Sequence, residues 1–322
     1  MRENKINTRA LVEAGKFSAL TLIFALLSLV LPVFSFVTVP LCAVPTVIVS
    51  VRHGFKYGIL TAVVASFLVS VFVEPASALS LFFIILFLGL SQGIAIRKNY
   101  SIPAVVFVGL VGAAIAVILI TILAYYLSGV NLFYEQIKIF KESIAAQEQL
   151  VLRYGLNKED IAAQQRLLNQ IVDSFSRIMP AVVVMISGWL SSLCGFISYQ
   201  VLRRLGFKLS KVVNFKKLQM PWFFSWGYLI GLAASLFYKS FGGYSEVILT
   251  VGMNLLLVFG IIFFIQGLAV AFYFFEKYKL SFGGKMLFFI FAVFIQIMFQ
   301  GLTWLGLFDT WFNYRKIPQE VC

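Results

Sequence analysis

The sequence predicts an all-α polytopic transmembrane protein: a helical bundle of about nine spans with an extracytoplasmic helical hairpin insertion. Three observations lead to this prediction. Of the 322 residues, 61% are hydrophobic and 35 are phenylalanine, which is more apolar side chain than a water-soluble core of this size can bury. Long apolar segments recur along the chain, and the short loops between them are alternately basic. Only residues 129–178 are polar and amphipathic throughout.

A transmembrane helix needs about 20 apolar residues, and nine segments approach or exceed this length. The second is short and contains Pro40 and Pro45. A helix of its length rises only about 20 Å. We therefore expect it to cross a locally thin part of the membrane, to be continued by irregular backbone, or to be re-entrant. The nine segments are Phe17–Val37, Val39–Val51, Tyr57–Val73, Ser77–Ile96, Ile102–Leu127, Met179–Leu202, Pro221–Tyr238, Val247–Phe275 and Met286–Phe308.

Lysine and arginine gather in every second loop, which predicts a cytoplasmic N-terminus and an extracytoplasmic C-terminus. The alternation keeps its phase only if Val39–Val51 crosses the membrane. The net charge of +13 therefore indicates orientation and attraction to anionic membrane lipids, and it does not indicate nucleic-acid binding. The basic loops contain Arg2, Lys5, Arg9 and Lys16; Arg52 and Lys56; Arg97 and Lys98; Arg203, Arg204, Lys208, Lys211, Lys216 and Lys217; and Lys277, Lys279 and Lys285.

The polar segment 129–178 divides the chain into three predicted parts. Its apolar residues recur with helical period, Gly155 is typical of a helix end, and Asn157 is typical of a helix start. We expect two amphipathic helices on the outer face, which serve as a cap on the bundle, a substrate lid or a partner-docking element. Residues 1–128 then form a five-span bundle, and residues 179–322 form a four-span region.

Polar and small residues inside the spans are the candidate functional residues. Asn254, Gln266, Gln296 and Gln300 lie well within apolar segments, where they either line a polar pocket or bond to a neighbouring helix. No carboxylate lies deep in a predicted span. Small residues that let helices approach closely cluster at the start of the first span and form a candidate partner-docking face: Ala10, Ala14, Gly15, Ser18 and Ala19.

Catalytic, metal and cofactor sites are not predicted. The cysteines Cys42, Cys194 and Cys322 are scattered and do not form a disulfide framework or a metal-ligand pattern. His53 is the only histidine, and no acid or nucleophile stands beside it in the sequence. Phosphate-binding loops, zinc-protease motifs and serine-hydrolase motifs are missing. We therefore expect no enzymatic activity.

Three N-terminal features together resemble a known family. These are the segment R-A-L-V-E-A-G-K-F-S-A-L from Arg9 to Leu20, the proline pair Pro40 and Pro45, and the segment V-R-H-G-F-K-Y-G from Val51 to Gly58. They resemble the YybS family of predicted bacterial membrane proteins. That family in turn resembles the substrate-binding membrane subunits, or S components, of energy-coupling-factor vitamin transporters.

The resemblance implies a six-helix bundle in a bacterial cell membrane. It implies that the small residues of the first helix meet a transmembrane coupling subunit, and that Gly54 and Gly58 form the turn into the third helix. The hairpin and the last three spans lie outside it. The function it favours is a transporter-related subunit that binds a small solute or a lipidic ligand. The alternative is a non-transporting membrane scaffold or regulator that acts through its outer hairpin and basic cytoplasmic loops.

Overall fold

The described part of the chain is helical. The computed structural model describes residues 7–129, 131, 134–139, 142, 174–207, 209–210, 214–279 and 281–317, and these residues contain no strand. Six helical segments among them are long and apolar enough to cross a membrane, or seven if one bent helix pair counts as a span. The prediction of an all-α polytopic membrane protein is therefore confirmed, while the predicted hairpin over 129–178 lies largely outside the described residues.

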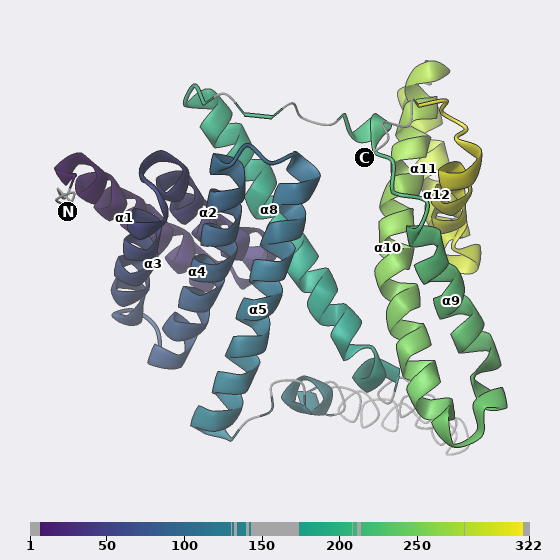
Figure 1. Ribbon diagram of the computed structural model, residues 1–322, viewed down its shortest axis with the longest axis horizontal. Helices are drawn as coiled ribbons and strands as arrows, with labels where there is room; N and C mark the ends of the chain where they lie inside the picture. The colour runs from purple at the N-terminus through teal and green to yellow at the C-terminus, as the bar shows by residue number, and fades with distance from the viewer. Residues whose placement is uncertain are drawn as a thin grey trace, which may run out of the picture. The chain divides into compact units, whose positions relative to one another are not determined.

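The chain forms two compact units, coloured purple to teal and green to yellow in Figure 1. The second unit contains α9 (Phe224–Phe237), α10 (Ser245–Lys277), α11 (Phe282–Phe299) and α12 (Gly301–Phe312). The first unit contains α1 (Thr8–Val30), α2 (Ser35–His53), α3 (Phe55–Ser70), α4 (Pro75–Arg97), α5 (Ile102–Ser128) and, from Val182 onward, α8 (Met179–Arg204).

The helix α8 belongs with the first five helices, whereas the predicted division at residue 179 grouped it with the C-terminal spans. Its side chains bond to three of those helices. Trp189 Nε1 donates to the carbonyl oxygen of Phe36 in α2, Ser191 accepts from Gln92 in α4, and Ser191 Oγ donates to the carbonyl oxygen of Val106 in α5. Within the part of the chain that the structure describes, the first unit therefore packs the six long helices α1–α5 and α8 into one bundle.

The helix α2 is longer than predicted and lies at the centre of the first unit. It begins at Ser35, and with the preceding turn Pro32–Phe34 it makes an apolar segment of 22 residues. The expectation of a short second span is therefore wrong. Helix continues through Pro40 because the carbonyl group that proline leaves without a donor, that of Phe36, accepts the Trp189 indole N–H at 2.9 Å.

Small residues let the neighbouring helices approach α2 closely. A Cβ atom on Gly58 of α3 would lie 2.0 Å from Ser50 Oγ, and one on Gly93 of α4 would lie 2.5 Å from Ser50 Cβ. One turn earlier, Gly89 packs in the same way against Thr46. Because lipid tails are as apolar as the side chains, helices in a membrane associate through such close packing together with interhelical hydrogen bonds and lipid entropy.

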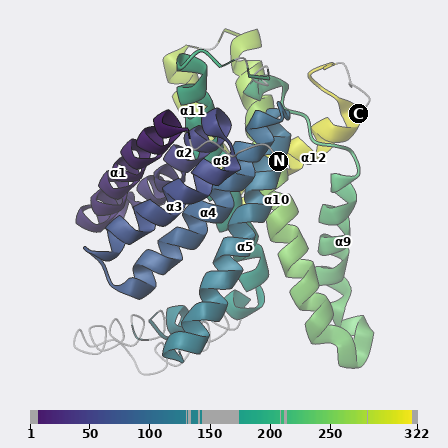
Figure 2. The ribbon, with the colours of Figure 1, turned by 60° about the vertical axis from the view of Figure 1, so that its left-hand side comes forward.

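The helix α10 organises the second unit. It is 33 residues long, and α9 lies alongside it in Figures 1 and 2. A Cβ atom on Gly267 would lie 1.9 Å from the carbonyl oxygen of Leu302, and one on Gly306 would lie 2.0 Å from that of Phe263. The short helix α12 therefore rests directly on the backbone of α10.

The last predicted span, Met286–Phe308, is broken. Gln300 adopts a left-handed conformation (φ 51°) between α11 and α12, and the two helices bend by 95°. Beyond α12, the guanidinium group of Arg315 bonds to the carbonyl oxygens of Lys216 and Leu218, which precede α9. The chain beyond α12 therefore lies beside the segment that contains Lys216, whereas the sequence predicts that the last span carries the C-terminus to the opposite side of the membrane from Lys216 and Lys217.

Candidate functional site

The fold divides the small-residue face of α1. Ser18 Oγ donates to the carbonyl oxygen of Thr61 at 3.0 Å, so this side of α1 is held against α3. Gly15 and Ala19 are exposed, and a Cβ atom on Gly15 would have nothing within 4 Å. Only these two of the five predicted docking residues remain open to a partner, because the fold buries the other three: Ala10, Ala14 and Ser18.

The turn from α2 into α3 is built on one of the two predicted glycines. Gly54 has φ +99°, a conformation that residues with a side chain rarely adopt, and a Cβ atom there would lie 2.6 Å from Arg97 Nη1. Gly58 lies one turn inside α3, and its lack of a side chain lets α3 approach Ser50 of α2 closely.

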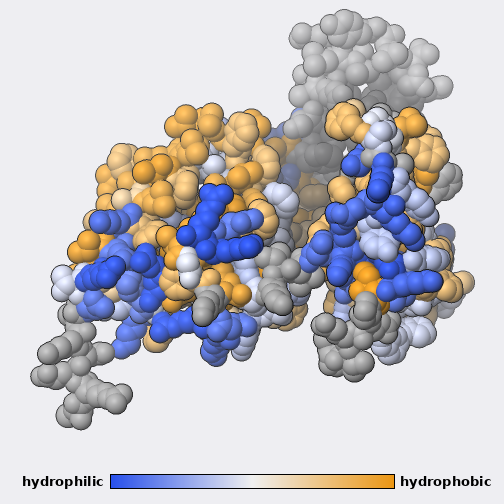
Figure 3. Space-filling model, turned by 90° about the horizontal axis from the view of Figure 1, so that it is seen from above, coloured by the Kyte–Doolittle hydropathy of each residue, from blue (hydrophilic) through white to orange (hydrophobic). Residues whose placement is uncertain are grey.

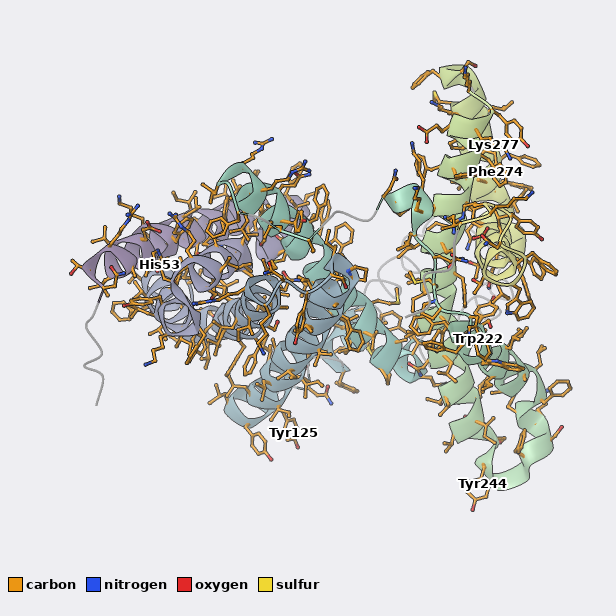
Figure 4. The ribbon with its side chains drawn as sticks, turned by 45° about the horizontal axis from the view of Figure 1, so that its top comes forward. His53, Tyr125, Trp222, Tyr244, Phe274 and Lys277 are labelled. Carbon is orange, nitrogen blue, oxygen red and sulfur yellow. The ribbon has the colours of Figure 1, made fainter. Side chains whose placement is uncertain are left out.

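An acidic residue of α1 lies at this turn. Glu13 Oε2 lies 2.8 Å from His53 Nε2 and 3.0 Å from Arg52 Nη1, and its Oε1 lies 3.6 Å from Arg9 Nε. Figure 4 shows His53 in the first unit. The fold thus supplies the acid that His53 lacks in the sequence, and the cluster links the start of α1 to the end of α2.

Four buried side chains of the first unit each have a polar atom without a hydrogen-bond partner among the described residues. We call Thr46, Ser50, Gln92 and Ser187 the polar seam. Each side chain is at most 1% exposed, and each has an oxygen with no hydrogen-bond partner among the described residues. These atoms are Thr46 Oγ1, Ser50 Oγ, Gln92 Oε1 and Ser187 Oγ. A buried polar group without a partner is unfavourable, most of all in a membrane, so the seam is a candidate functional site.

Gln92 is the best-anchored member of the seam. Its Nε2 atom donates to the carbonyl oxygen of Ser191 at 2.7 Å and to Ser191 Oγ at 2.8 Å. Cβ atoms on Gly109 and Gly195 would lie 2.4 and 3.2 Å from Nε2, so the amide is enclosed by the backbones of α5 and α8. The fixed amide leaves Oε1 as an acceptor within the bundle.

Each of the four polar residues predicted from the C-terminal spans has hydrogen-bond partners of its own. Asn254 Oδ1 accepts from the backbone N–H of Ala181 at 2.7 Å, and Asn254 Nδ2 donates to the carbonyl oxygen of Arg177. Gln300 Oε1 accepts the hydroxyl proton of Tyr228 at 2.9 Å. Within the described residues these side chains therefore bond to neighbouring helices, as the second interpretation of the sequence allowed.

The side chain of Gln296 provides hydrogen-bond partners for the backbone N–H groups at the break between α11 and α12. Its Oε1 accepts from the backbone N–H groups of Leu302 at 3.0 Å and Thr303 at 3.4 Å, and its Nε2 donates to Thr303 Oγ1. The first N–H groups of a helix have no partner within that helix, so a side chain must supply one. Gln296 and Gln300 therefore support the break rather than a shared helical face.

Gln266 belongs to a buried ionic network at the end of α12. Its Nε2 donates to Asp309 Oδ2 at 3.2 Å and to Thr310 Oγ1 at 3.0 Å. Arg315 donates to the same carboxylate oxygen from Nη2 at 2.7 Å and from Nε at 3.1 Å. The side chains of Asp309 and Arg315 are both 0% exposed, and Asp309 Oδ1 has no hydrogen-bond partner among the described residues.

Sequence reasoning did not identify Asp309 and Arg315 as a pair. Asp309 follows the last predicted span by one residue, and Arg315 was assigned to the outer tail. The turn at Asn313 (φ 45°) brings them together: its Oδ1 accepts from the N–H of Ile317, and its Nδ2 donates to the carbonyl oxygen of Ile317. An acid at the boundary of an apolar segment, followed closely by an arginine, is the signal that would have indicated the pair.

Comparisons with known proteins agree with a membrane protein. The family described as "Predicted membrane protein (DUF2232)" matches residues 19–310. The chain is 22% identical to "Uncharacterized protein YybS" of Bacillus subtilis (strain 168), over 309 residues that cover 96% of this chain and 98% of that protein. No solved structure matches. The family match extends over all the helices from α2 to α11 and most of α1 and α12, and the chain therefore belongs to this family of membrane proteins, DUF2232, with YybS as a relative.

Proposed function

We propose that the protein is a transporter-related membrane subunit whose first unit binds a small solute or lipidic ligand and works with a coupling subunit. The observation that supports the proposal is the polar seam, whose four buried side chains on α2, α4 and α8 each have an oxygen without a partner among the described residues. The seam offers hydroxyl groups and one amide oxygen and no charged group, so an uncharged ligand that donates hydrogen bonds fits it best. The resemblance of the N-terminal segments to S components agrees with the six-helix grouping.

The proposal includes an orientation in a bacterial cell membrane. Basic residues at the N-terminal end of α1, at the α2–α3 turn and at the ends of α4 and α8 support a cytoplasmic location for this end of the first unit. Figure 3, which looks down on each unit, shows hydrophilic residues gathered beside hydrophobic ones. Anionic lipid headgroups at the cytoplasmic surface are the expected neighbours of these side chains.

The test is purification of the full-length protein in mild detergent, followed by mass spectrometry of the small molecules and proteins that remain bound. We expect a retained small molecule to be lost in Thr46→Val and Ser187→Ala, which remove only a hydroxyl group without a partner. Both variants should keep the wild-type melting temperature. Ser191→Ala is the contrasting variant, because it removes a hydroxyl that bonds to Gln92. A retained molecule that survives in both seam variants would refute the seam as its site.

The same purification tests the coupling subunit. Ala19→Trp places a large side chain on the exposed side of α1 without disturbing the bundle, whereas Ala14→Trp would disrupt packing because Ala14 is 2% exposed. We expect Ala19→Trp to lose a co-purifying membrane subunit and Ile118→Trp, on the exposed side of α5, to retain it. If the membrane subunit still co-purified with Ala19→Trp, the proposed docking face on α1 would be refuted.

The scaffold alternative has its own test. If deletion of residues 131–178 alone abolished activity, the scaffold alternative would be favoured.

A further inference from the structure

Arg315 connects the end of α12 to a segment of the second unit that lies 97–99 residues earlier in the sequence. Its Nη1 donates to the carbonyl oxygen of Lys216 at 2.6 Å, and its Nη2 donates to that of Leu218 at 2.7 Å and to Asp309 Oδ2. With the bond from Nε to Asp309, four donations hold this guanidinium group. The buried arginine is therefore neutralised by α12 and bonded to the segment that leads into α9.

The same segment is held at two further points by α10. Gln266 Oε1 accepts from the backbone N–H of Met220 at 3.0 Å, and Lys216 Nζ lies 2.6 Å from Glu276 Oε2. Gln266 also donates to Asp309, so one amide side chain joins the segment, α10 and α12. We call the network in which Gln266 and Arg315, both bonded to Asp309, hold residues 216–220 the clasp.

The break at Gln300 lies near the same end of the second unit. Gln300 accepts from Tyr228, which is four residues into α9 and therefore only about 6 Å along its axis from its first residue. Likewise Leu302 packs on Gly267, ten residues before the end of α10, or about 15 Å along that axis. The hydrocarbon layer is about 30 Å thick, so neither contact places the break at the far end of α9 or α10.

We propose that α11 and α12 form a re-entrant hairpin, which enters and leaves the membrane at one face and is locked by the clasp to the segment before α9. The inference does not depend on the proposed function of the first unit. Irregular backbone inside a membrane requires internal partners, and Gln296 provides them at the turn. A re-entrant hairpin must also have its returning end held at the face where it entered. The clasp does this, because it fixes that end to residues 216–220.

Thiol labelling tests the hairpin in the full-length protein in native membranes. Cys42 and Cys194 are buried, so Cys322 is the natural reporter for the tail, and five residues beyond Ile317 reach at most about 17 Å, less than a membrane. Lys217→Cys and Tyr244→Cys, each combined with Cys322→Ser, report the two ends of α9. Tyr244 and Lys277 lie at opposite ends of α10 in Figure 4.

A membrane-impermeant maleimide should label Cys322 and residue 217 from one side and residue 244 from the other. Labelling of Cys322 from the side that labels residue 244 would overturn the re-entrant hairpin.

A double-mutant cycle tests the clasp. Arg315→Gln and Asp309→Asn each leave one buried charge alone, so each should lower the melting temperature, while the double variant should lower it by less than the sum. In Arg315→Gln, a thiol introduced at the half-buried Leu218 should react about tenfold faster, which corresponds to a loss of about 1.4 kcal/mol. Arg177→Gln is the control, because its pair with Glu246 is partly exposed.

The clasp would be refuted if the two losses of melting temperature were additive, or if the thiol at residue 218 reacted no faster in Arg315→Gln. Either result would refute the clasp even if the labelling of Cys322 supported the hairpin.

Discussion

At the scale of single residues, polar side chains repair the places where helical hydrogen bonding fails. Pro40 leaves the carbonyl group of Phe36 without its helical donor, and the indole of Trp189 supplies one from another helix. Gln296 does the same for the first N–H groups of α12. In water such groups could bond to solvent, but in a membrane each repair must come from the protein. Polar residues within apolar segments are therefore not all ligand-binding residues.

Trp189→Phe should destabilise the first unit. The change keeps the aromatic ring that packs near Phe36 but removes the only N–H that the side chain can donate. Interhelical hydrogen bonds in membranes contribute about 0.6–2 kcal/mol, so we expect a loss of about 1 kcal/mol, measured as a lower melting temperature in detergent. Trp222→Phe is the matched control, because the exposed indole of Trp222 has no hydrogen-bond partner among the described residues and only the carbonyl group of Trp222 accepts a bond. An unchanged melting temperature in Trp189→Phe would mean that water satisfies the Phe36 carbonyl group.

At the scale of helices, backbone-to-backbone packing determines which neighbours an element can have. The helix α12 is only 12 residues long, and it rests on α10 through Gly267 and Gly306, where a side chain would collide with backbone oxygen atoms. Spacing in the sequence shows where a helix has small residues, but it does not show which neighbour they contact. The glycines of α10 and α12 were for this reason not recognised as a contact surface.

Gly306→Ala should separate α12 from α10. A Cβ atom would lie 2.0 Å from the carbonyl oxygen of Phe263, and backbone cannot move aside as a flexible side chain can. Overpacking of this kind typically costs about 1–3 kcal/mol, so we expect a clear drop in melting temperature and faster proteolysis near the C-terminus. Gly283→Ala is the control, because a Cβ atom there meets nothing within 4 Å. Equal effects of the two substitutions would show that the contact between α12 and α10 is not essential.

At the scale of the whole molecule, sequence periodicity predicts the existence of helices better than their grouping. Composition and apolar segments were sufficient for the fold class. Each predicted segment overlaps a helix, although Phe17–Val37 continues past the end of α1 at Val30 and Met286–Phe308 is broken at Gln300. The grouping of α8 with α1–α5 depends on bonds such as Gln92 to Ser191, which join residues 99 positions apart. The return of the C-terminal segment depends on the buried pair of Asp309 and Arg315. Contacts of this kind leave no periodic pattern in a single sequence.

A chain that ends at residue 212 should insert and fold as the six-helix bundle. The bonds that hold α8 to its neighbours, through Trp189 and Ser191, lie within this part of the chain. We expect a monodisperse protein in detergent, with a melting temperature within a few degrees of that of the full-length protein. Trp189→Phe in the shortened chain should lower its stability as much as in the full-length chain. Aggregation of the shortened chain would show that the first unit needs the second.

The length of α10 has a consequence for the surrounding lipid. Its 33 residues extend about 50 Å, and even a tilt of about 40°, the upper end of what membrane helices adopt, leaves about 38 Å across a hydrocarbon layer of about 30 Å. At least one end of α10 therefore reaches the headgroups, and at its C-terminal end the ammonium group of Lys277 lies 5.7 Å from the ring centre of Phe274. Bilayer thickness thus determines how much of α10 is immersed, and acyl-chain length becomes a variable to which the second unit must respond.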